Sequence, residues 1–533
     1  MNRTRTALLI AVLVAGGAHA APPADLDAYV ARAMKQFKAP AGVAIAIVED
    51  GKTTLAKGYG IRKMGNPQPA DQHTVFAIGS CGKAFTTTAL ATLVDEGKLA
   101  WSDKVADRLN GFRMYDPFTT TEMTIADMLV HNSGLPLGGG DLMFFPTTNF
   151  TRQEMVEHLR YIKPAASFRS AYAYDNVLYV AAGRMIEQIS GIAWEDYIAQ
   201  HIFAPLGMRD SVPAPNYLRS DNYAWPHARL DGPLRGLGNA KPLAIEEEMK
   251  KQDVAAPAGA ILSSATDMAR WLQVQMDRGT IGGTDKRLFS AESAEEMWTP
   301  RTLQPSDPLP PQLAETGATM EAYAFGWDVR DYRGQKLFTH SGAVEGSLAI
   351  VAVLPKQRAA FAVMINSEDG AVRQAIYYRL LDHYVGATSP DYIEIYRQYR
   401  EQRIAAALKQ LDTKSAEAKK TKVRPSLPPA RYVGVYKDDW YGTMTITHTD
   451  NKLRIRFDRT PTMVGDLQHL HDDTFAAHWD DRRIEDAYVT FSLDHDGAIA
   501  EVRMKAISPL ADFSFDYHDL LFRPVAPPPA TSQ

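Results

Sequence analysis

The sequence predicts two folded units, an α+β domain with helices on an antiparallel sheet and, after it, an antiparallel β-barrel. Three observations support this fold class. Apolar runs typical of strands lie near both ends of residues 21–388, while helical patterns fill the middle. Pro425, Pro428 and Pro429 then interrupt the chain. From residue 432 onward, short alternating runs separated by turn signals are typical of a barrel or sandwich of about 100 residues.

The predicted strands of the first unit come from its two ends. An Asp-Gly turn indicates a hairpin near the start, and four apolar runs follow near the end. We therefore expect a sheet whose edges come from the two termini of the domain. These strands are predicted at 42–48, 53–59, 323–329, 336–340, 348–354 and 359–366.

The composition is that of an ordinary globular protein. Of 533 residues, 45% are hydrophobic and 23% are charged, and the formal net charge is −5. No basic block stands out, which argues against nucleic acid as a partner. The single cysteine, Cys81, excludes an intrachain disulfide.

Residues 1–20 have the pattern of a cleavable signal peptide. Arg3 and Arg5 precede an apolar run that is too short to span a bilayer, and Ala18-His19-Ala20 offers a cleavage site. We therefore expect a periplasmic or secreted protein without a membrane span. A homo-oligomer is left open by the sequence.

The expected domain organisation follows from these boundaries. A charged helical pattern from Asp391 to Lys420 supplies most of a linker between the two units. Glycine-rich and then aromatic residues 137–150 form either a loop that borders a cleft or a plain surface loop. In the barrel, one strand is expected at 513–517. The expected segments are a signal peptide (1–20), the α+β domain (21–388), a helical linker (389–429), the barrel (430–524) and a disordered tail (525–533).

Ser80 and Lys83 form the stretch with the clearest chemistry. They stand three residues apart at the start of a helical pattern that runs from Ala84 to Glu96, so they project from one face of a helix. This spacing brings the two side chains close enough for an amine to take the proton of a hydroxyl. The partial positive charge of the helix N-terminus favours an alkoxide. Alone the pattern is also met by an N-capping serine with a solvated lysine.

Three stretches, including the one around Ser80, resemble one family of enzymes. The segment 77–96 is similar to the nucleophile helix of class C β-lactamase-type serine hydrolases, which carry S-x-x-K. Tyr174-Asp175-Asn176 is similar to their Y-x-N motif. His340-Ser341-Gly342 matches the third motif, K-T-G in β-lactamases and H-x-G in several relatives. The order of the motifs and their helix or strand contexts agree with this family over residues 25–385. The resemblance implies the β-lactamase-type fold and hydrolysis by a serine nucleophile. The barrel resembles the lipocalin-like domain appended to some of these hydrolases.

The resemblance implies a role for each matched residue. Ser80 would be the nucleophile, and either Lys83 or Tyr174 the general base. Asn176 would orient Lys83 or the substrate. The backbone N–H groups of Ser80 and Ala343, beside Ser341 and Gly342, would bind the oxyanion.

His340 stands where β-lactamases and transpeptidases have a lysine that binds a carboxylate. A near-neutral imidazole is a weaker anchor for that group. By resemblance to D-aminopeptidase-like and esterase relatives, in which H-x-G occurs, this shifts the expected substrate from β-lactams toward small peptides, including peptides with D-residues, or toward esters.

Other reactive side chains are assigned structural roles. Cys81 points about 100° away from Ser80 on a helix and reads as a small buried residue. His469, His471 and His478 do not match a zinc spacing. We therefore expect no metal and no other cofactor.

The sequence prediction is a serine hydrolase that cleaves amide bonds of small peptides through a Ser80 ester. The alternatives are a carboxylesterase, a β-lactamase or D-Ala-D-Ala carboxypeptidase, and a catalytically silent binding protein with the same fold. The presence of Ser80, Lys83, Tyr174 and Asn176 together argues against the last.

Overall fold

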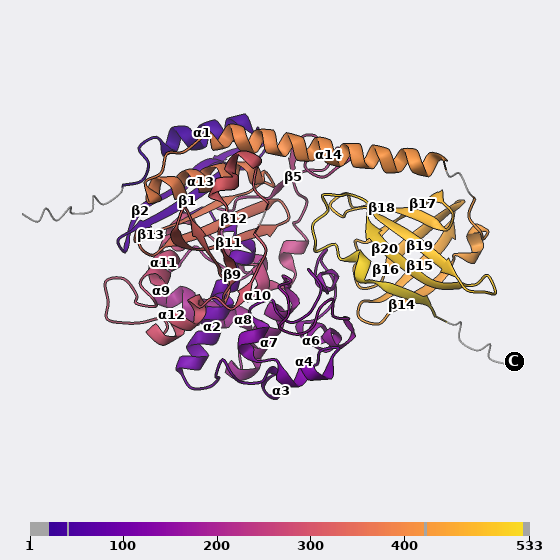
Figure 1. Cartoon of the computed structure of the whole chain (residues 1–533), viewed down its shortest axis with the longest axis horizontal. Coiled ribbons are helices and arrows are strands. Elements are labelled where there is room, and N and C mark those ends of the chain that lie inside the picture. The colour runs from indigo at the N-terminus through magenta and orange to yellow at the C-terminus, as the bar shows by residue number, and fades with distance from the viewer. Residues whose placement is uncertain (1–20, 40–41, 307, 421–423, 526–533) are drawn as a thin grey trace, which may run out of the picture.

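The computed structural model describes residues 21–39, 42–306, 308–420 and 424–525. The predicted signal peptide, residues 1–20, lies outside the described residues. So does the predicted tail at 525–533, apart from Val525. Figure 1 shows a large mixed domain, a long helix along one side of it, and a smaller barrel beyond. No helix in the described part of the chain is both long and apolar enough to cross a membrane.

An antiparallel nine-stranded sheet forms the centre of the first domain, in the order β3-β2-β1-β13-β12-β11-β10-β9-β8. Its strands are β1 (Gly42–Glu49), β2 (Lys52–Lys63), β3 (Asn66–Pro69), β8 (Thr302–Leu303), β9 (Glu321–Tyr323), β10 (Asp328–Tyr332), β11 (Gln335–Val344), β12 (Ser347–Leu354) and β13 (Ala359–Ile365). Two short pairs lie outside it: β4 (Phe76–Ala77) with β7 (Leu262–Ser263), and β5 (His227–Arg229) with β6 (Ala240–Pro242).

The expectation that the two termini supply the sheet edges is wrong. β1 pairs with β13 inside the sheet, with Val43 opposite Ile365, and the edges are β3 and β8. All eight residues of β1 are buried. Such a continuous apolar run suits a strand that is covered on both faces, which is a central position rather than an edge. The single strand expected at 323–329 is also two strands, β9 and β10, separated by a turn.

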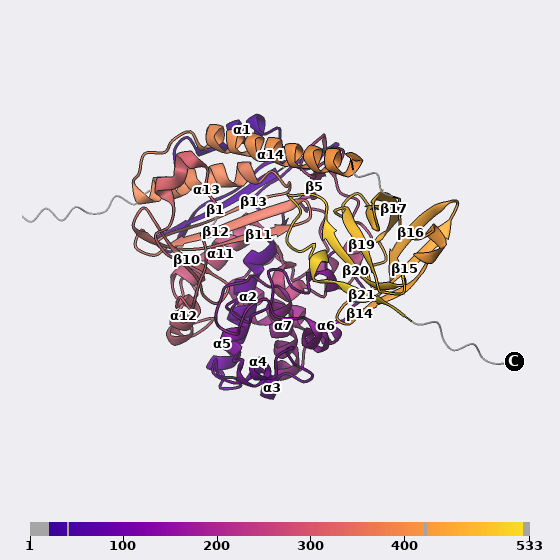
Figure 2. The same ribbon diagram turned by 45° about the vertical axis from the view of Figure 1, so that its right-hand side comes forward.

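Helices cover both faces of the sheet. Val43, Ile45 and Ile47 of β1 pack with α1, α13 and the start of α14, whereas Ala44 and Ala46 face the helices on the other side. Alternate residues of a strand point to opposite faces, which explains the division. Figure 2 shows α1, α13 and α14 on one side of the sheet and α2, α7 and α11 on the other. The helices are α1 (Leu26–Gln36), α2 (Lys83–Asp95), α3 (Val105–Arg108), α4 (Pro117–Glu122), α5 (Ile125–Met128), α6 (Arg152–His158), α7 (Val177–Ser190), α8 (Trp194–Ile198), α9 (Ala204–Leu206), α10 (Ala256–Gly259), α11 (Ala265–Met276), α12 (Ala291–Trp298), α13 (Gly370–Val385) and α14 (Tyr392–Lys420).

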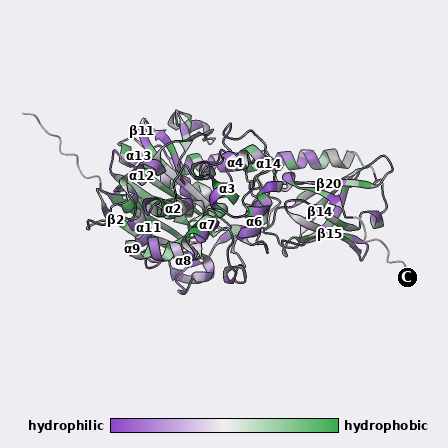
Figure 3. Cartoon of the chain, turned by 90° about the horizontal axis from the view of Figure 1, so that it is seen from below, coloured by the Kyte–Doolittle hydropathy of each residue, from purple (hydrophilic) through white to green (hydrophobic). Residues whose placement is uncertain are grey.

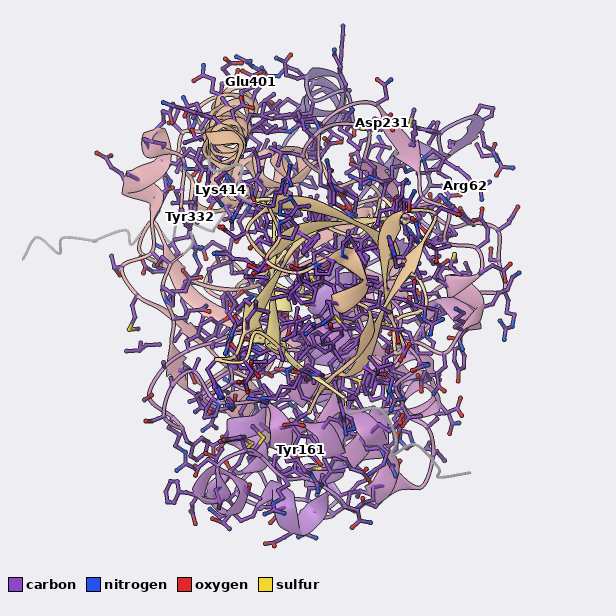
Figure 4. The ribbon with its side chains drawn as sticks, turned by 90° about the vertical axis from the view of Figure 1, so that its right-hand side faces the viewer. Arg62, Tyr161, Asp231, Tyr332, Glu401 and Lys414 are labelled. Carbon is purple, nitrogen blue, oxygen red and sulfur yellow. The ribbon has the colours of Figure 1, made fainter. Side chains whose placement is uncertain are left out.

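Helix α14 connects the two domains. It starts against the first domain, where Tyr392 is fully buried, and Figure 3 shows hydrophilic residues along the stretch between the domains. Figure 4 looks onto the barrel from its far side, with Glu401 and Lys414 marking the course of the helix above it.

The C-terminal domain is a closed antiparallel barrel, as predicted. Its strands are β14 (Gly434–Asp438), β15 (Gly442–Thr449), β16 (Lys452–Phe457), β17 (Val464–His471), β18 (Thr474–Trp479), β19 (Ala487–Leu493), β20 (Ile499–Ala506) and β21 (Leu521–Pro524). The sequence reasoning missed β17, β18 and β21. The strand expected at 513–517 is wrong, because that segment leaves the barrel wall and contacts the first domain instead.

The barrel packs on the loop at residues 137–150. One apolar core continues from Leu142 and Phe150 of the first domain into Tyr441 and Phe515 of the barrel. The rings of Phe145 and Phe515 lie 5.1 Å apart. The loop is therefore not a plain surface loop, because it is packed between the barrel and the interior of the first domain.

Candidate active site

Ser80 lies in a tight turn between a strand and a helix. A 3₁₀ turn, η1 (Gly79–Gly82), follows β4 and runs directly into α2. Gly79 has a φ of +53°, and a Cβ there would come within 2.5 Å of the Ala343 nitrogen. Only glycine suits this position. Ser80 is half-buried, although the residues around it are buried, so its hydroxyl stands at the accessible edge of the core.

Lys83 is fully buried at the first position of α2. Its Nζ lies 3.1 Å from the Ser80 Oγ, 2.6 Å from the Asn176 Oδ1 and 3.0 Å from the Ala258 carbonyl oxygen. Burial penalises the charged amine and lowers the pKa of Lys83 to about 7, although nearby Asp141 and Asp175 act in the opposite direction. At neutral pH a substantial fraction of this lysine is therefore uncharged.

The hydrogen bonds of Lys83 direct its lone pair. A neutral amine has two N–H groups and one lone pair. Asn176 Oδ1 and the Ala258 carbonyl can only accept, so they take the two N–H groups. The remaining contact is Ser80 Oγ, which can donate its proton to the lone pair. The geometry is that of a general base hydrogen-bonded to its nucleophile.

Tyr174 and Asn176 come from the segment that leads into α7. The helix begins directly after Asn176 and is capped at its C-terminal end by Gly191. The Tyr174 hydroxyl is hydrogen-bonded to Ser80, and burial raises the pKa of this phenol well above its ordinary value. Its ring also lies 4.7 Å from the Lys83 Nζ. The phenol therefore holds its proton at neutral pH and can give it to a leaving group.

The strand that carries His340, Ser341 and Gly342 borders Ser80. A Cβ at Gly342 would lie 1.9 Å from the Ile78 carbonyl oxygen and 3.1 Å from the Ser80 nitrogen, so the turn and β11 touch through backbone atoms. Glycine is required for this approach. Ser80 N and Ala343 N therefore both lie beside this contact between the turn and β11. Their role as oxyanion donors stays a prediction. Ser341 and Ala343 are exposed.

His340 is buried, and both its ring nitrogens have partners. Nδ1 lies 2.6 Å from the Ser341 carbonyl oxygen, which can only accept, so Nδ1 carries the proton. Nε2 then accepts from the Tyr323 hydroxyl at 2.8 Å. Burial lowers the pKa of His340 to about 3. The imidazole is thus neutral, and its two nitrogens are engaged within the protein. A substrate-contacting role for His340 stays a prediction.

The profile of the Beta-lactamase family matches residues 26–385, which carry all of these groups. The chain belongs to the Beta-lactamase family. Its relatives include proteins named as hydrolases and penicillin-binding proteins, and it is a serine hydrolase. A second profile, a domain of unknown function (DUF3471), matches residues 418–524 in the barrel region.

Several individual proteins resemble this β-lactamase-family hydrolase. The "unguisins hydrolase" of Aspergillus violaceofuscus is 28% identical over 85% of this chain and 82% of its own length. Penicillin-binding protein 4 of Amycolatopsis lactamdurans is 27% identical over 65% of this chain and 85% of its own. The octameric penicillin-binding protein homologue from Pyrococcus abyssi shares the fold, with a TM-score of 0.58, 23% identity and coverage of 94% of this chain and 99% of that one.

Sequence reasoning missed three groups that adjoin this site. Asp141 is fully buried and accepts a hydrogen bond from Asn176 Nδ2 at 2.9 Å. Ser514, from the barrel, donates to the same Asp141 oxygen at 2.7 Å. The Tyr323 hydroxyl is hydrogen-bonded to His340 Nε2. Asp141 carried a signal in the sequence, because a lone carboxyl group follows three glycines and precedes an apolar run. Nothing local in the sequence marks Ser514.

Cys81 lies away from the reaction. It is buried, and its thiol donates to the His340 carbonyl oxygen, while burial raises its pKa to about 12. A thiol that keeps its proton is a poor nucleophile. The barrel histidines also have protein partners: His469 contacts the Asp472 carbonyl, and His478 contacts Asp486. In the described ranges, no cluster of three or more His, Cys, Asp or Glu could hold a metal ion.

Proposed function

We propose that the protein hydrolyses amide bonds of small peptides, including peptides with D-residues, through an ester on Ser80. The observation that carries the proposal is the arrangement of Lys83, whose two N–H groups are engaged and whose lone pair faces the Ser80 hydroxyl. A lysine with a pKa near 7 is matched to proton transfer at neutral pH.

In the first step, the Ser80 oxygen attacks the substrate carbonyl carbon while its proton moves to Lys83. The backbone N–H groups of Ser80 and Ala343 bind the oxyanion, each worth about 3 kcal/mol of barrier. Collapse breaks the C–N bond. Tyr174 gives its proton to the leaving nitrogen, and the proton held by Lys83 neutralises the phenolate. Water then attacks the ester and loses a proton to the same groups, which releases the acid and restores Ser80.

Two considerations favour amide substrates that do not need a carboxylate group for binding. His340 replaces the lysine that binds a carboxylate in β-lactamases, and both its nitrogens are engaged in the protein. The unguisins hydrolase, whose alignment covers 85% of this chain, is named a hydrolase rather than a β-lactamase. A carboxylesterase is the second candidate, since an ester needs less assistance for its leaving group than an amide does.

A substrate panel tests the proposal. Purified protein and its Ser80→Ala variant are assayed on D- and L-aminoacyl amides, p-nitrophenyl esters and nitrocefin. We expect Ser80-dependent turnover of amides, with esters second and nitrocefin last. Turnover of nitrocefin alone would move the assignment to a β-lactamase. Turnover of none, with no labelling of Ser80 by a fluorophosphonate, would favour a binding protein.

We also propose a cleavable signal peptide, a periplasmic or secreted location and assembly into a homo-oligomer. The sequence pattern of residues 1–20 supports the first two. The Pyrococcus abyssi homologue is described as octameric, which supports the third. N-terminal sequencing of the exported protein and light scattering of the purified protein test these expectations. An intact Met1 or a monomer would contradict them.

A further inference from the structure

A segment of the barrel, residues 512–516, reaches the groups that surround Ser80. The ring of Phe513 lies 5.8 Å from that of Tyr174. A Cβ at Gly138 would come within 2.7 Å of Phe513, so the opposite loop leaves room for this side chain. The Asp516 carboxylate accepts from the backbone N–H groups of Gly140 and Leu142 at 2.8 and 3.2 Å. These contacts fix the barrel segment and the 137–150 loop against each other.

Asp141 joins this segment to the catalytic lysine. One of its oxygens, Oδ2, accepts from Ser514 Oγ at 2.7 Å and from Asn176 Nδ2 at 2.9 Å. The other end of the same amide, Asn176 Oδ1, accepts from Lys83. A continuous line of hydrogen bonds therefore runs from a serine of the barrel to the amine beside Ser80.

The polarity of this line matters for catalysis. An amide has a donating and an accepting end, and either end fits the space between two polar groups. Because Asp141 Oδ2 accepts, the amide must turn its NH₂ toward Asp141 and its oxygen toward Lys83. In the reverse orientation, the NH₂ of Asn176 would donate to the lone pair of Lys83. That lone pair would then no longer be free to take the proton of Ser80.

We propose that Asp141 and the barrel residue Ser514 are positioning residues for acyl transfer at Ser80, acting by fixing the amide of Asn176 so that the lone pair of Lys83 faces the nucleophile. This inference rests on the proposed function. It gives the barrel a direct part in the reaction, because one of the two groups that hold the accepting oxygen of Asp141 comes from that domain.

The charges around Asp141 are compatible with this role. Burial raises the pKa of Asp141 to about 7, with the nearby Asp512 adding to the rise, while Ser514, Asn176 and the charge on Lys83 oppose it. Asp516, across the interface, is a further carboxyl group that interacts with it. Asp141 Oδ1 has no hydrogen-bond partner among the described residues. A proton on Oδ1 therefore leaves Oδ2 able to accept from both Ser514 and Asn176.

The proposal is tested with full-length variants. Asp141→Asn lets either end of the Asn176 amide face Lys83, so kcat should fall by about 10- to 100-fold with little change in KM. The variant also removes a negative charge that favours protonated Lys83, so the acidic limb of the kcat/KM profile should move to lower pH. A purely structural role would not move this limb. Ser514→Ala should lower kcat by about fivefold, as expected for the loss of one hydrogen bond, and Ser514→Thr should restore it.

Ser492→Ala is the matched control, because Ser492 is exposed on β19 of the same barrel, and it should match the parent protein. Thermal unfolding and fluorophosphonate labelling of Ser80 check that each variant is folded. If Asp141→Asn does not fold, the Ser514 pair decides alone. Unchanged kcat in Ser514→Ala, or no rescue by Ser514→Thr, would overturn the proposal while Ser80-dependent turnover persists. Turnover that persists in Ser80→Ala would instead refute the proposed function.

Discussion

Two buried carboxyl groups in the first domain have contrasting surroundings. Asp382, on α13, is fully buried, and both its oxygens have partners: Tyr332 and Arg333 donate to Oδ1, and Tyr392 donates to Oδ2. Asp141 is equally buried, yet Oδ1 makes no hydrogen bond with the described residues. The Asp382 cluster joins the sheet to α13 and α14, whereas the Asp141 cluster adjoins Ser80.

The difference shows how one type of buried polar group serves two purposes. A satisfied carboxylate with a cation beside it holds elements together, and disrupting it leaves unpaired groups in the interior. Around Ser80, burial acts on Lys83 and Asp141 without a direct ion pair between them, and it moves the pKa of each to about 7. Groups poised in this way can exchange protons at neutral pH.

The largest expected effect is on turnover when Lys83 is removed. Lys83→Met should lower kcat by about 10⁴-fold, because Tyr174, the other group hydrogen-bonded to Ser80, keeps its own proton at neutral pH and cannot take that of Ser80. Its stability should be equal or higher, since a buried amine is replaced by an apolar chain of similar length. Steady-state kinetics and urea unfolding measure the two quantities. Turnover within about tenfold of the parent would remove lysine from the mechanism.

The opposite pattern is expected at Asp382. Asp382→Ala should destabilise the fold by about 3 kcal/mol, because Arg333 and two tyrosine hydroxyls lose their acceptor. The remaining folded protein should keep its kcat. The free energy of unfolding in urea and active-site titration with a fluorophosphonate separate the two effects. A loss of kcat per labelled site, with stability unchanged, would contradict a purely structural role for Asp382.

The pH dependence should follow the titration of Lys83. Protonation removes the lone pair, so kcat/KM should fall by about tenfold for each pH unit below about 7. The folded pKa lies below the ordinary value of 10.5, so the unfolded chain binds more protons between these values and stability rises with pH across that window. The stability difference between Lys83→Met and the parent should narrow there. A flat rate profile through neutrality would contradict Lys83 as the base.

The smallest effect is expected at Cys81. Cys81→Ala should change turnover by less than about twofold and cost about 1 kcal/mol, because it removes one buried sulfur and its weak bond to the His340 carbonyl. Mass spectrometry should still find the fluorophosphonate on Ser80. Labelling that disappears in this variant would reassign the nucleophile.

The features that could be predicted from the sequence are those that depend on neighbouring residues. The motifs at Ser80, Tyr174 and His340 lie on short stretches whose spacing and neighbours indicate their contexts, and Gly191 marks the end of α7. The pairing of β1 with β13 was not predicted, because strand order depends on contacts between distant segments rather than on either apolar run.

The barrel was harder to predict in its detail. β17 mixes exposed and partly buried polar residues with few strong strand formers, so it gave no clear alternating signal. The segment 513–517 alternates in sequence, yet its contacts do not alternate. Residues 513–516 all contact the first domain, and Tyr517 donates to the Glu485 carbonyl of the barrel. Asp141 and Ser514 are 373 positions apart. Only the docked domains show that they meet.

The contact between Ser514 and Asp141 also sets an order of events during synthesis. The ribosome completes Ser80, Lys83 and Asn176 long before it reaches the barrel segment that steadies Asp141. Until that segment is made, Asp141 lacks the hydrogen bond from Ser514 that steadies it. On the positioning proposal, hydrolysis reaches its full rate only when the barrel has closed and docked, so an incomplete chain would turn over substrate more slowly than the finished protein.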